Sequence, residues 1–335
     1  MATIFACRVR RLGRICGILA DVTVQNETAM AEEQGNLVRR QREALALSKF
    51  VGTSPVFCQA IRSVSAAALS DAAVLVAGET GTGKELVARA VHYLSARAAG
   101  PFVAVNCGSL TDTLLEDELF GHERGAFTDA RQRRGGLLAQ AEGGTLFLDE
   151  VDTLTPRGQV ALLRVLQDKV YRPLGAEREY QAQVRFVAAS NQPMMAAVDA
   201  GTFRADLYYR LSVFTITLPP LRERPEDVLP LATHFLAKHC PLGEPLPEIS
   251  ADASAALTAF SWPGNVRELE NAMIRAVRLR DGPAIEIRHL QLPGTHEGHA
   301  AKLPERFGTF RMLKRQLIQT FEQDYLNIIK RHFLR

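Results

Sequence analysis

The sequence predicts an α/β fold in which a parallel sheet is wrapped by helices and followed by a small all-helical domain. Five apolar runs, each followed by a helix-length segment, occur between Phe50 and about Leu221: "VLVAG", "FVAVNC", "TLFLD", "VRFVAAS" and "FTITLP". Strands that alternate with helices in this way form parallel sheets. After the proline-rich "LPPLRERPED" the apolar strands stop, and helical patterns continue from about Asp227 to Leu279.

Composition and charge exclude several classes of protein. The chain has 335 residues, of which 47% are apolar and 23% charged, so it can form one large domain or two smaller ones. The net charge of +3 does not require a polyanionic partner, and contact with nucleic acid would depend on a local patch. The five cysteines contain no CxxC pair, which argues against a disulfide framework or a zinc site and favours a reducing cytosol. They are Cys7, Cys16, Cys58, Cys107 and Cys240.

Neither a secretion signal nor a membrane span is expected. Arginines repeatedly interrupt the apolar start "MATIFACRVRRLGRICGILA", and no other stretch approaches the ~18 apolar residues that a span requires. We therefore expect a cytoplasmic protein without membrane contact.

Six segments are expected along the chain. Residues 1–24 have the pattern of a short strand pair, and residues 25–48 that of a charged linker helix. The α/β part covers 49–222 and the helical part 223–292. Residues 293–307, rich in Gly, Pro and His, are expected to form a linker, and residues 308–335 an amphipathic terminal helix.

A glycine-rich loop follows the first strand. Its "GETGTGKE" matches the G-x-x-x-x-G-K pattern of phosphate-binding loops, in which backbone N–H groups surround a phosphate chain and the lysine neutralises it. The residue after the lysine is a glutamate, so Thr82 or water would replace the usual hydroxyl ligand of Mg²⁺. The alternative is a chance glycine-rich turn. The candidate residues are Gly78, Glu79, Thr80, Gly81, Thr82, Gly83, Lys84 and Glu85.

Two carboxylates end the strand "TLFLDE". Ligands of open α/β sheets bind at the carboxyl ends of the strands, where Asp149 could hold Mg²⁺ and Glu150 could polarise a water. Paired acids at a strand end also occur as simple helix caps.

Two weaker signals follow further along the chain. Asn191, at the end of "VRFVAAS", could orient water or a γ-phosphate, although Asn is also an ordinary turn residue. "FRADLYYRL" contains Arg204 and Arg210, which form either a solvated helix face or groups that stabilise phosphoryl-transfer charge in a neighbouring subunit.

The chain resembles the AAA+ ATPase domain of bacterial enhancer-binding proteins, the NtrC-like activators that act on sigma-54 RNA polymerase. The resemblance covers about Phe50 to Leu292 and is carried by "GETGTGKE", "FGHERGAFTDA", "LFLDEVD", "FRADLYYRL", "LPPLRER" and "WPGNVREL". It implies a homo-oligomeric ring, expected to be hexameric, that hydrolyses ATP with Mg²⁺. It also implies that hydrolysis remodels the closed complex of sigma-54 with RNA polymerase and so activates transcription.

The resemblance also implies roles for individual residues. The loop with Lys84 would bind ATP, and Asp149 and Glu150 would be the Walker B acids. Asn106 would pair with the catalytic glutamate and switch it, and Asn191 would be sensor I. Arg204 and Arg210 would be trans-acting arginine fingers, and Arg267 would be sensor II. Val51 and Gly52 would contact the adenine.

The run "GHERGAFTDA" would be the loop that contacts sigma-54. In the family this loop rises from the top of the ring, so an unburied Phe127 would contact the partner. A buried loop aromatic is the alternative. Asp129 stands where the family's usual "GAFTGA" has glycine, which leaves its effect open. The implied contact residues are Gly125, Ala126, Phe127, Thr128, Asp129 and Ala130.

Both ends depart from the layout that is common in the family. Residues 1–24 resemble the last part of a PAS sensor domain, and residues 308–335 resemble the helix that leads into a helix-turn-helix. We therefore expect no complete DNA-binding domain in this chain, although promoter contact is possible. Two alternatives to the activator remain: a ring subunit with little hydrolysis of its own, and a DNA-binding protein.

Overall fold

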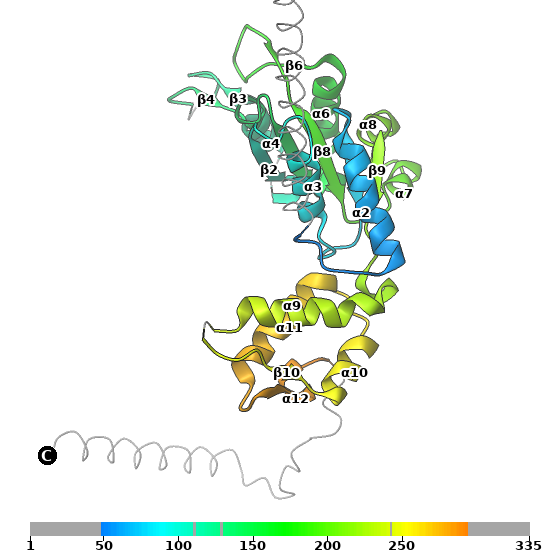
Figure 1. Ribbon diagram of the computed structural model, residues 1–335. Coiled ribbons are helices and arrows are strands. Elements are labelled where there is room, and N and C mark those ends of the chain that lie inside the picture. The colour runs from blue at the N-terminus through cyan, green and yellow to red at the C-terminus, as the bar shows by residue number, and fades with distance from the viewer. Residues whose placement is uncertain (1–47, 110–111, 128–129, 242, 294–335) are drawn as a thin grey trace, which may run out of the picture.

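The computed structural model describes residues 48–109, 112–127, 130–241 and 243–293. These residues form an α/β unit and, after it in the chain, a helical unit (Figure 1). The expected strand pair over 1–24, most of the linker helix over 25–48 and the terminal helix over 308–335 lie outside the described residues.

A five-stranded parallel sheet forms the centre of the α/β unit. Its spatial order is β2-β5-β8-β1-β9, and every adjacent pair is parallel. The five apolar runs in the sequence are these five strands, so the expected parallel sheet is confirmed. The strands are β1 (Val74–Ala77), β2 (Phe102–Asn106), β5 (Thr145–Asp149), β8 (Arg185–Ser190) and β9 (Phe214–Thr217).

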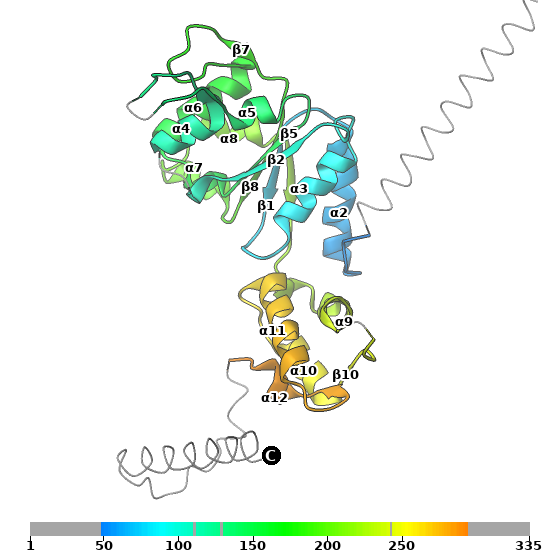
Figure 2. The same cartoon turned by 90° about the vertical axis from the view of Figure 1, so that its left-hand side faces the viewer.

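Helices cover both faces of this sheet (Figure 2). One face packs against α2 (Pro55–Ala68) and α3 (Lys84–Tyr93). The other packs against five helices: α4 (Asp112–Phe120), α5 (Leu137–Gln140), α6 (Pro156–Asp168), α7 (Met194–Asp199) and α8 (Ala205–Leu211).

Alternation along the strands explains the two cores. Val74 and Val76 of the central β1 pack with α2 and α3, whereas Leu75 between them packs with the cluster on the opposite face. Successive side chains of a strand point to opposite faces, so an uninterrupted apolar run is what a sheet buried on both faces requires.

Two short hairpins extend from the α/β unit. One pairs β3 (Gly121–His122) with β4 (Arg134–Gly135), and the other pairs β6 (Val170–Tyr171) with β7 (Tyr180–Gln181). A bridge between His122 and Leu174 holds the two hairpins together.

The second unit is mainly helical. Its core encloses Trp262, which is fully buried and donates a hydrogen bond from Nε1 to the Leu257 carbonyl (2.9 Å). The predicted helical domain is confirmed, and a two-residue parallel pair is added to it. The elements are α9 (Val228–His239), β10 (Glu248–Ile249), α10 (Ala251–Ala259), α11 (Asn265–Leu279), β11 (Ala284–Ile285) and α12 (Ile287–Leu290). Within the described part of the chain, no helix is long and apolar enough to cross a membrane.

Candidate nucleotide-binding site

The glycine-rich loop lies between β1 and α3. Gly81 and Gly83 adopt φ values of 81° and 104°, which favour glycine. A Cβ at Gly81 would also lie 2.3 Å from the carbonyl oxygen of Gly264 in the helical unit, so no other residue fits there. The loop therefore has the conformation that its sequence predicts.

Lys84 begins α3, and its side chain turns back into the loop. Its Nζ donates hydrogen bonds to the carbonyls of Gly78 (2.7 Å) and Glu79 (3.1 Å). Burial lowers the pKa of Lys84, while the carboxylate of Asp149, above all the nearby acids, raises it. A buried cation with several carboxylates nearby is suited to an anionic, metal-associated ligand.

Asp149 and Glu150 stand at the end of β5. Burial raises the pKa of Asp149, and the Glu150 backbone N–H donates to Asp149 Oδ1 (3.0 Å). Glu150 has φ 54°, a left-handed conformation that costs a non-glycine residue about 1–3 kcal/mol and is found mainly at functional sites. The strained backbone turns the chain abruptly from the strand into the 3₁₀ helix η2 (Val151–Thr153).

Asn191 connects the lysine to the glutamate. Its Oδ1 accepts a hydrogen bond from Lys84 Nζ, and its Nδ2 donates to Glu150 Oε1 (3.2 Å). Sequence reasoning missed Asp152, which accepts from the backbone N–H of Asn191 (3.3 Å) and from Gln192 Nε2 (2.9 Å). The signal was present, because Asp152 is the third acid of "LFLDEVD".

Asn106 ends β2 directly opposite Asp149 in the register. Its Oδ1 accepts from the backbone N–H of Gly108 (2.8 Å), and a Cβ at Gly108 would lie 2.7 Å from Glu150 Oε2. Asn106 and Glu150 thus both lie against Gly108, but the amide that hydrogen-bonds to Glu150 is that of Asn191. The pairing of Asn106 with Glu150 stays a prediction.

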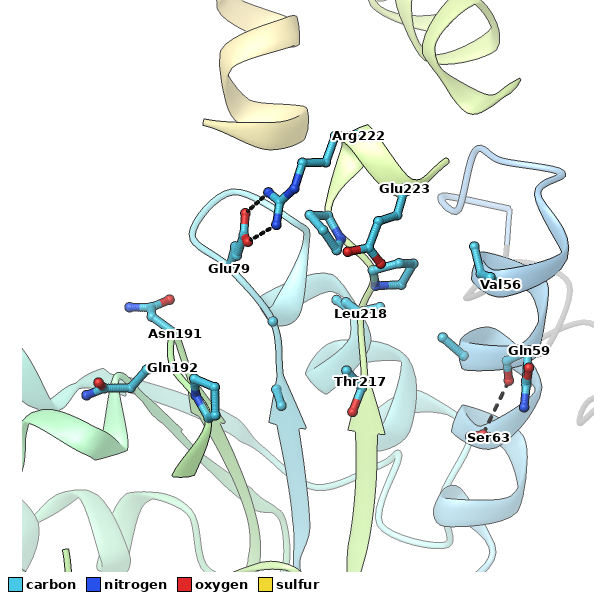
Figure 3. A pocket seen from close by; sticks show the side chains of 16 residues that line it. Val56, Gln59, Ser63, Glu79, Asn191, Gln192, Thr217, Leu218, Arg222 and Glu223 are labelled. Atoms are coloured by element: carbon cyan, nitrogen blue, oxygen red, sulfur yellow. Dashed lines mark hydrogen bonds and ion pairs between the residues drawn. The ribbon is translucent and has the colours of Figure 1, made fainter. Parts of the chain in front are cut away.

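An open cavity of about 790 Å³ lies beside the loop, bordered by α2 and by the ends of β1, β8 and β9 (Figure 3). At its edge Glu79 accepts two hydrogen bonds from Arg222, at 2.6 and 2.8 Å, and one from Asn265 Nδ2 at 3.2 Å. These donors, Arg222 first, lower the pKa of Glu79 to about 2. Arg222 and Asn265 had no predicted role, although both lie in motifs that the sequence displays.

The first turn of α11 rests on the same loop. The backbone N–H groups of Val266 and Arg267 donate to the Gly81 carbonyl, at 3.0 and 3.3 Å. The Arg267 side chain is exposed, and its charge lowers the pKa of Lys84 as a minor contribution. Arg267 therefore lies near the group that would meet the phosphates.

A second cavity of about 570 Å³ lies on the other side of the loop. Phe50 and Val51 line it together with Thr82 and Gly83 of the loop and with residues of α3, α9 and α11. Gly52 follows immediately, and a Cβ there would lie 2.7 Å from the ring of Phe57. The position of Val51 is therefore compatible with the expected base contact.

Arg204 and Arg210 lie at the two ends of α8, and both are exposed. Arg204 forms an ion pair with Asp206 (2.7 Å). Arg210 is close enough to Lys169 to lower its pKa, although burial is the main cause. Arg210 comes four residues before Phe214, where β9 begins, so it lies toward the amino ends of the parallel strands, whereas the loop is at their carboxyl ends.

Phe127 lies in the connection between β3 and β4. Its ring is 44% exposed and meets the ring of His122 edge to face, with the centroids 4.9 Å apart. Gly125 donates from its backbone to the Ala130 carbonyl (2.8 Å), which closes the base of the loop. Thr128 and Asp129 lie outside the described residues.

Comparison with known proteins agrees with this geometry. The sigma-54 interaction domain matches residues 50–217, and an AAA+ ATPase lid domain matches 222–305. The activator SfnR of Pseudomonas putida is 47% identical over 76% of this chain and 70% of its own length. The regulatory protein AtoC of Escherichia coli is 46% identical over 74% and 55%. This chain spans little more than half the length of several such relatives.

Solved structures show the same fold. NtrX from Brucella abortus in complex with ATP superposes with a TM-score of 0.69 at 33% identity, over 88% of this chain and 66% of NtrX. The complex of NtrX with ADP gives a TM-score of 0.66 at 36% identity, over 78% and 58%. The chain thus belongs to the sigma-54 interaction domain family of AAA+ ATPases, the family of the sigma-54-dependent transcriptional activators.

Proposed function

We propose that this protein hydrolyses ATP to ADP and phosphate and uses the cycle to remodel the closed complex of sigma-54 RNA polymerase, so that transcription is activated. One observation carries the proposal: a single amide, that of Asn191, joins the lysine of the phosphate-binding loop to Glu150 at the end of the neighbouring acidic strand. A phosphate sensor that contacts both groups suits phosphoryl transfer to water.

Each group has a separate task in this proposal. When nucleotide binds, phosphate oxygens replace the loop carbonyls as hydrogen-bond acceptors of the Lys84 ammonium group. Glu150 orients the attacking water and accepts its proton. Arg267 at the start of α11 contacts the phosphates from the helical unit. Asn106 adjusts Glu150 from the neighbouring strand.

Asp149 suits a magnesium ion bound together with the nucleotide. Among the described residues, no group of three or more His, Cys, Asp or Glu side chains is arranged to hold a metal ion. Mg²⁺ in nucleotide sites commonly uses one or two carboxylates, phosphate oxygens and water, so one strand-end aspartate suffices. The Thr82 hydroxyl donates a hydrogen bond to the Glu79 carbonyl (2.8 Å), which leaves its oxygen lone pairs free to coordinate the ion. When bound, the ion neutralises charge on the phosphates.

The active site is shared between subunits of a homo-oligomeric, hexameric ring. Arg204 and Arg210 are exposed at the two ends of a helix that lies far along the sequence from the phosphate-binding loop, which supports a role toward a neighbour's γ-phosphate. The loop with Phe127 then carries the mechanical output to sigma-54, because it offers an exposed aromatic ring on a closed base.

Glu150→Gln tests the hydrolytic part of the proposal. The amide retains the size of the side chain but cannot accept the proton, so turnover of Mg²⁺–ATP should fall by ~100-fold or more while ATP binding persists. Glu248→Gln, an exposed glutamate at the start of β10, is the matched control. Undiminished hydrolysis by Glu150→Gln would remove Glu150 from the mechanism. If the wild-type protein binds ATP in rings but does not hydrolyse it, the chain is a regulatory subunit instead.

A further inference from the structure

Two charged residues are buried where the α/β unit passes into the helical unit. Arg224, which precedes the 3₁₀ turn η4 (Pro225–Asp227), is 1% exposed, and Asp227, which ends that turn, is fully buried. Buried charges are costly unless they are paired and hydrogen-bonded. The partners of these two residues therefore indicate what this turn, residues 224–227, does.

The Asp227 carboxylate accepts hydrogen bonds from two residues that lie 174 and 173 positions earlier in the sequence. Its Oδ1 accepts from the backbone N–H groups of Thr53 (2.6 Å) and Ser54 (2.9 Å), and its Oδ2 accepts from Ser54 Oγ (2.7 Å). Ser54 is the N-cap residue of α2, yet its side chain makes no local capping bond. Asp227 is in turn the N-cap residue of α9. One carboxylate thus stands at the amino ends of two helices, where a negative charge is favoured.

Arg224 adds two contacts to the same junction. Its guanidinium carbon lies 4.6 Å from the ring centroid of Phe57 in α2, and its Nη2 reaches the carbonyl of Thr82 in the phosphate-binding loop (3.5 Å). Burial lowers the pKa of Arg224, and Asp227 opposes that shift. Residues 224–227 therefore contact α2, the loop and the start of α9 together.

These contacts determine the walls of the 570 Å³ cavity. Phe50 and Val51 form one wall and are separated only by Gly52 from the two residues that Asp227 binds, and Phe235 of α9 belongs to another wall. The chain is packed closely at this point, because a Cβ at Gly52 would lie 2.8 Å from Asp227 Oδ2. Fixing Thr53 and Ser54 to the first turn of α9 therefore fixes the spacing between the two walls.

We propose that Asp227, acting through Ser54, is a positioning residue for the base of the bound nucleotide: it holds the wall at Val51 at a fixed distance from α9. This inference rests on the proposed function, because it takes the cavity to hold the base of ATP. It predicts that removing a hydrogen bond between Asp227 and Ser54 weakens binding of the base and leaves binding of the phosphates intact, since the phosphate-binding loop keeps its own contacts to Lys84.

Ser54→Ala is the principal test, because it removes one of three hydrogen bonds and no buried charge. The dissociation constants of ADP and of pyrophosphate, both with Mg²⁺, are measured by titration calorimetry on the full chain. For ADP we expect an increase of about tenfold, the scale of one hydrogen bond to a charged group, and for pyrophosphate less than about twofold. The KM for ATP should rise in parallel while kcat is retained.

Two further variants separate positioning from general stability. Ser54→Thr retains the hydroxyl and should return the ADP constant to within about threefold of the wild type. Ser250→Ala removes a true helix cap, the bond from the Ala253 N–H to Ser250 Oγ. It should lower the thermal midpoint without changing either constant.

Unchanged ADP affinity in Ser54→Ala would overturn the inference, and so would equal losses for ADP and pyrophosphate. The absence of ADP binding by the wild-type protein would instead refute the proposed function, and this inference with it.

Discussion

Replacing Asn191 by alanine should separate the chemical step from nucleotide binding. The substitution removes the hydrogen bond to Glu150 Oε1 and one of the three acceptors of Lys84 Nζ, while the carbonyls of Gly78 and Glu79 still hold the lysine. Binding should therefore survive, and the loss should fall on Glu150, whose carboxylate is no longer oriented.

The size of the effect follows from that single bond. A hydrogen bond to a charged group contributes about 1.5–3 kcal/mol, and ~1.4 kcal/mol corresponds to a factor of ten in rate. We expect kcat for Mg²⁺–ATP to fall by about 10- to 150-fold and KM to change by less than about threefold.

Steady-state turnover as a function of protein concentration, together with ADP titration, provides the measurement. Gln192→Ala is the matched control, since the neighbouring amide binds Asp152 and not Glu150. Turnover of Asn191→Ala within about twofold of the control would refute the reasoning, and so would a loss of ADP binding as large as the loss of turnover.

Three further predictions concern the ring, the metal site and the partner loop. Mixtures of Lys84→Ala and Arg204→Ala subunits should exceed either variant alone, because a mixed interface can unite an intact loop with an intact finger worth ~10³-fold in rate; activity that never exceeds the components contradicts a shared site. Burial raises the pKa of Asp149, so the free energy of unfolding of the nucleotide-free protein should fall as the pH rises through that pKa. Asp149→Asn should accordingly raise the thermal unfolding midpoint at pH 7 while turnover of Mg²⁺–ATP falls by ~100-fold. A lowered midpoint would contradict the expectation that the charge of Asp149 destabilises the nucleotide-free protein. Phe127→Ala should abolish the binding of sigma-54 measured in the presence of a transition-state analogue of ATP hydrolysis, while turnover stays within about twofold of the wild type. Asp129→Gly should change sigma-54 binding by several-fold at similar turnover. Equal sigma-54 binding by the wild type and Phe127→Ala would show that this loop is not the sigma-54 contact.

The sheet and the phosphate-binding loop were predictable because their signals are local. Each strand is a short run rich in apolar residues, and the glycines of the loop stand at fixed spacing from Lys84. Asp149 and Glu150 were also found locally, at the end of such a run.

The contacts between distant segments could not be predicted in the same way. Nothing near Asp227 in the sequence indicates that its carboxylate binds Ser54, 173 residues away, or that Arg222 binds Glu79. Asn191 had only a weak signal as a residue after a strand, and its importance appears when β8 places it beside Lys84. These pairings depend on how distant segments pack in three dimensions, which periodicity and spacing do not encode.

The burial of Trp262 gives the protein an optical probe of its own. It is the only tryptophan in the sequence, and its indole is enclosed beside Phe260, two residues before Gly264, whose carbonyl abuts Gly81 of the phosphate-binding loop. Its fluorescence emission should be that of an indole shielded from water, and a rearrangement that reaches the core around Trp262 would change it. Stopped-flow fluorescence on the unlabelled protein can therefore test whether nucleotide binding rearranges this core.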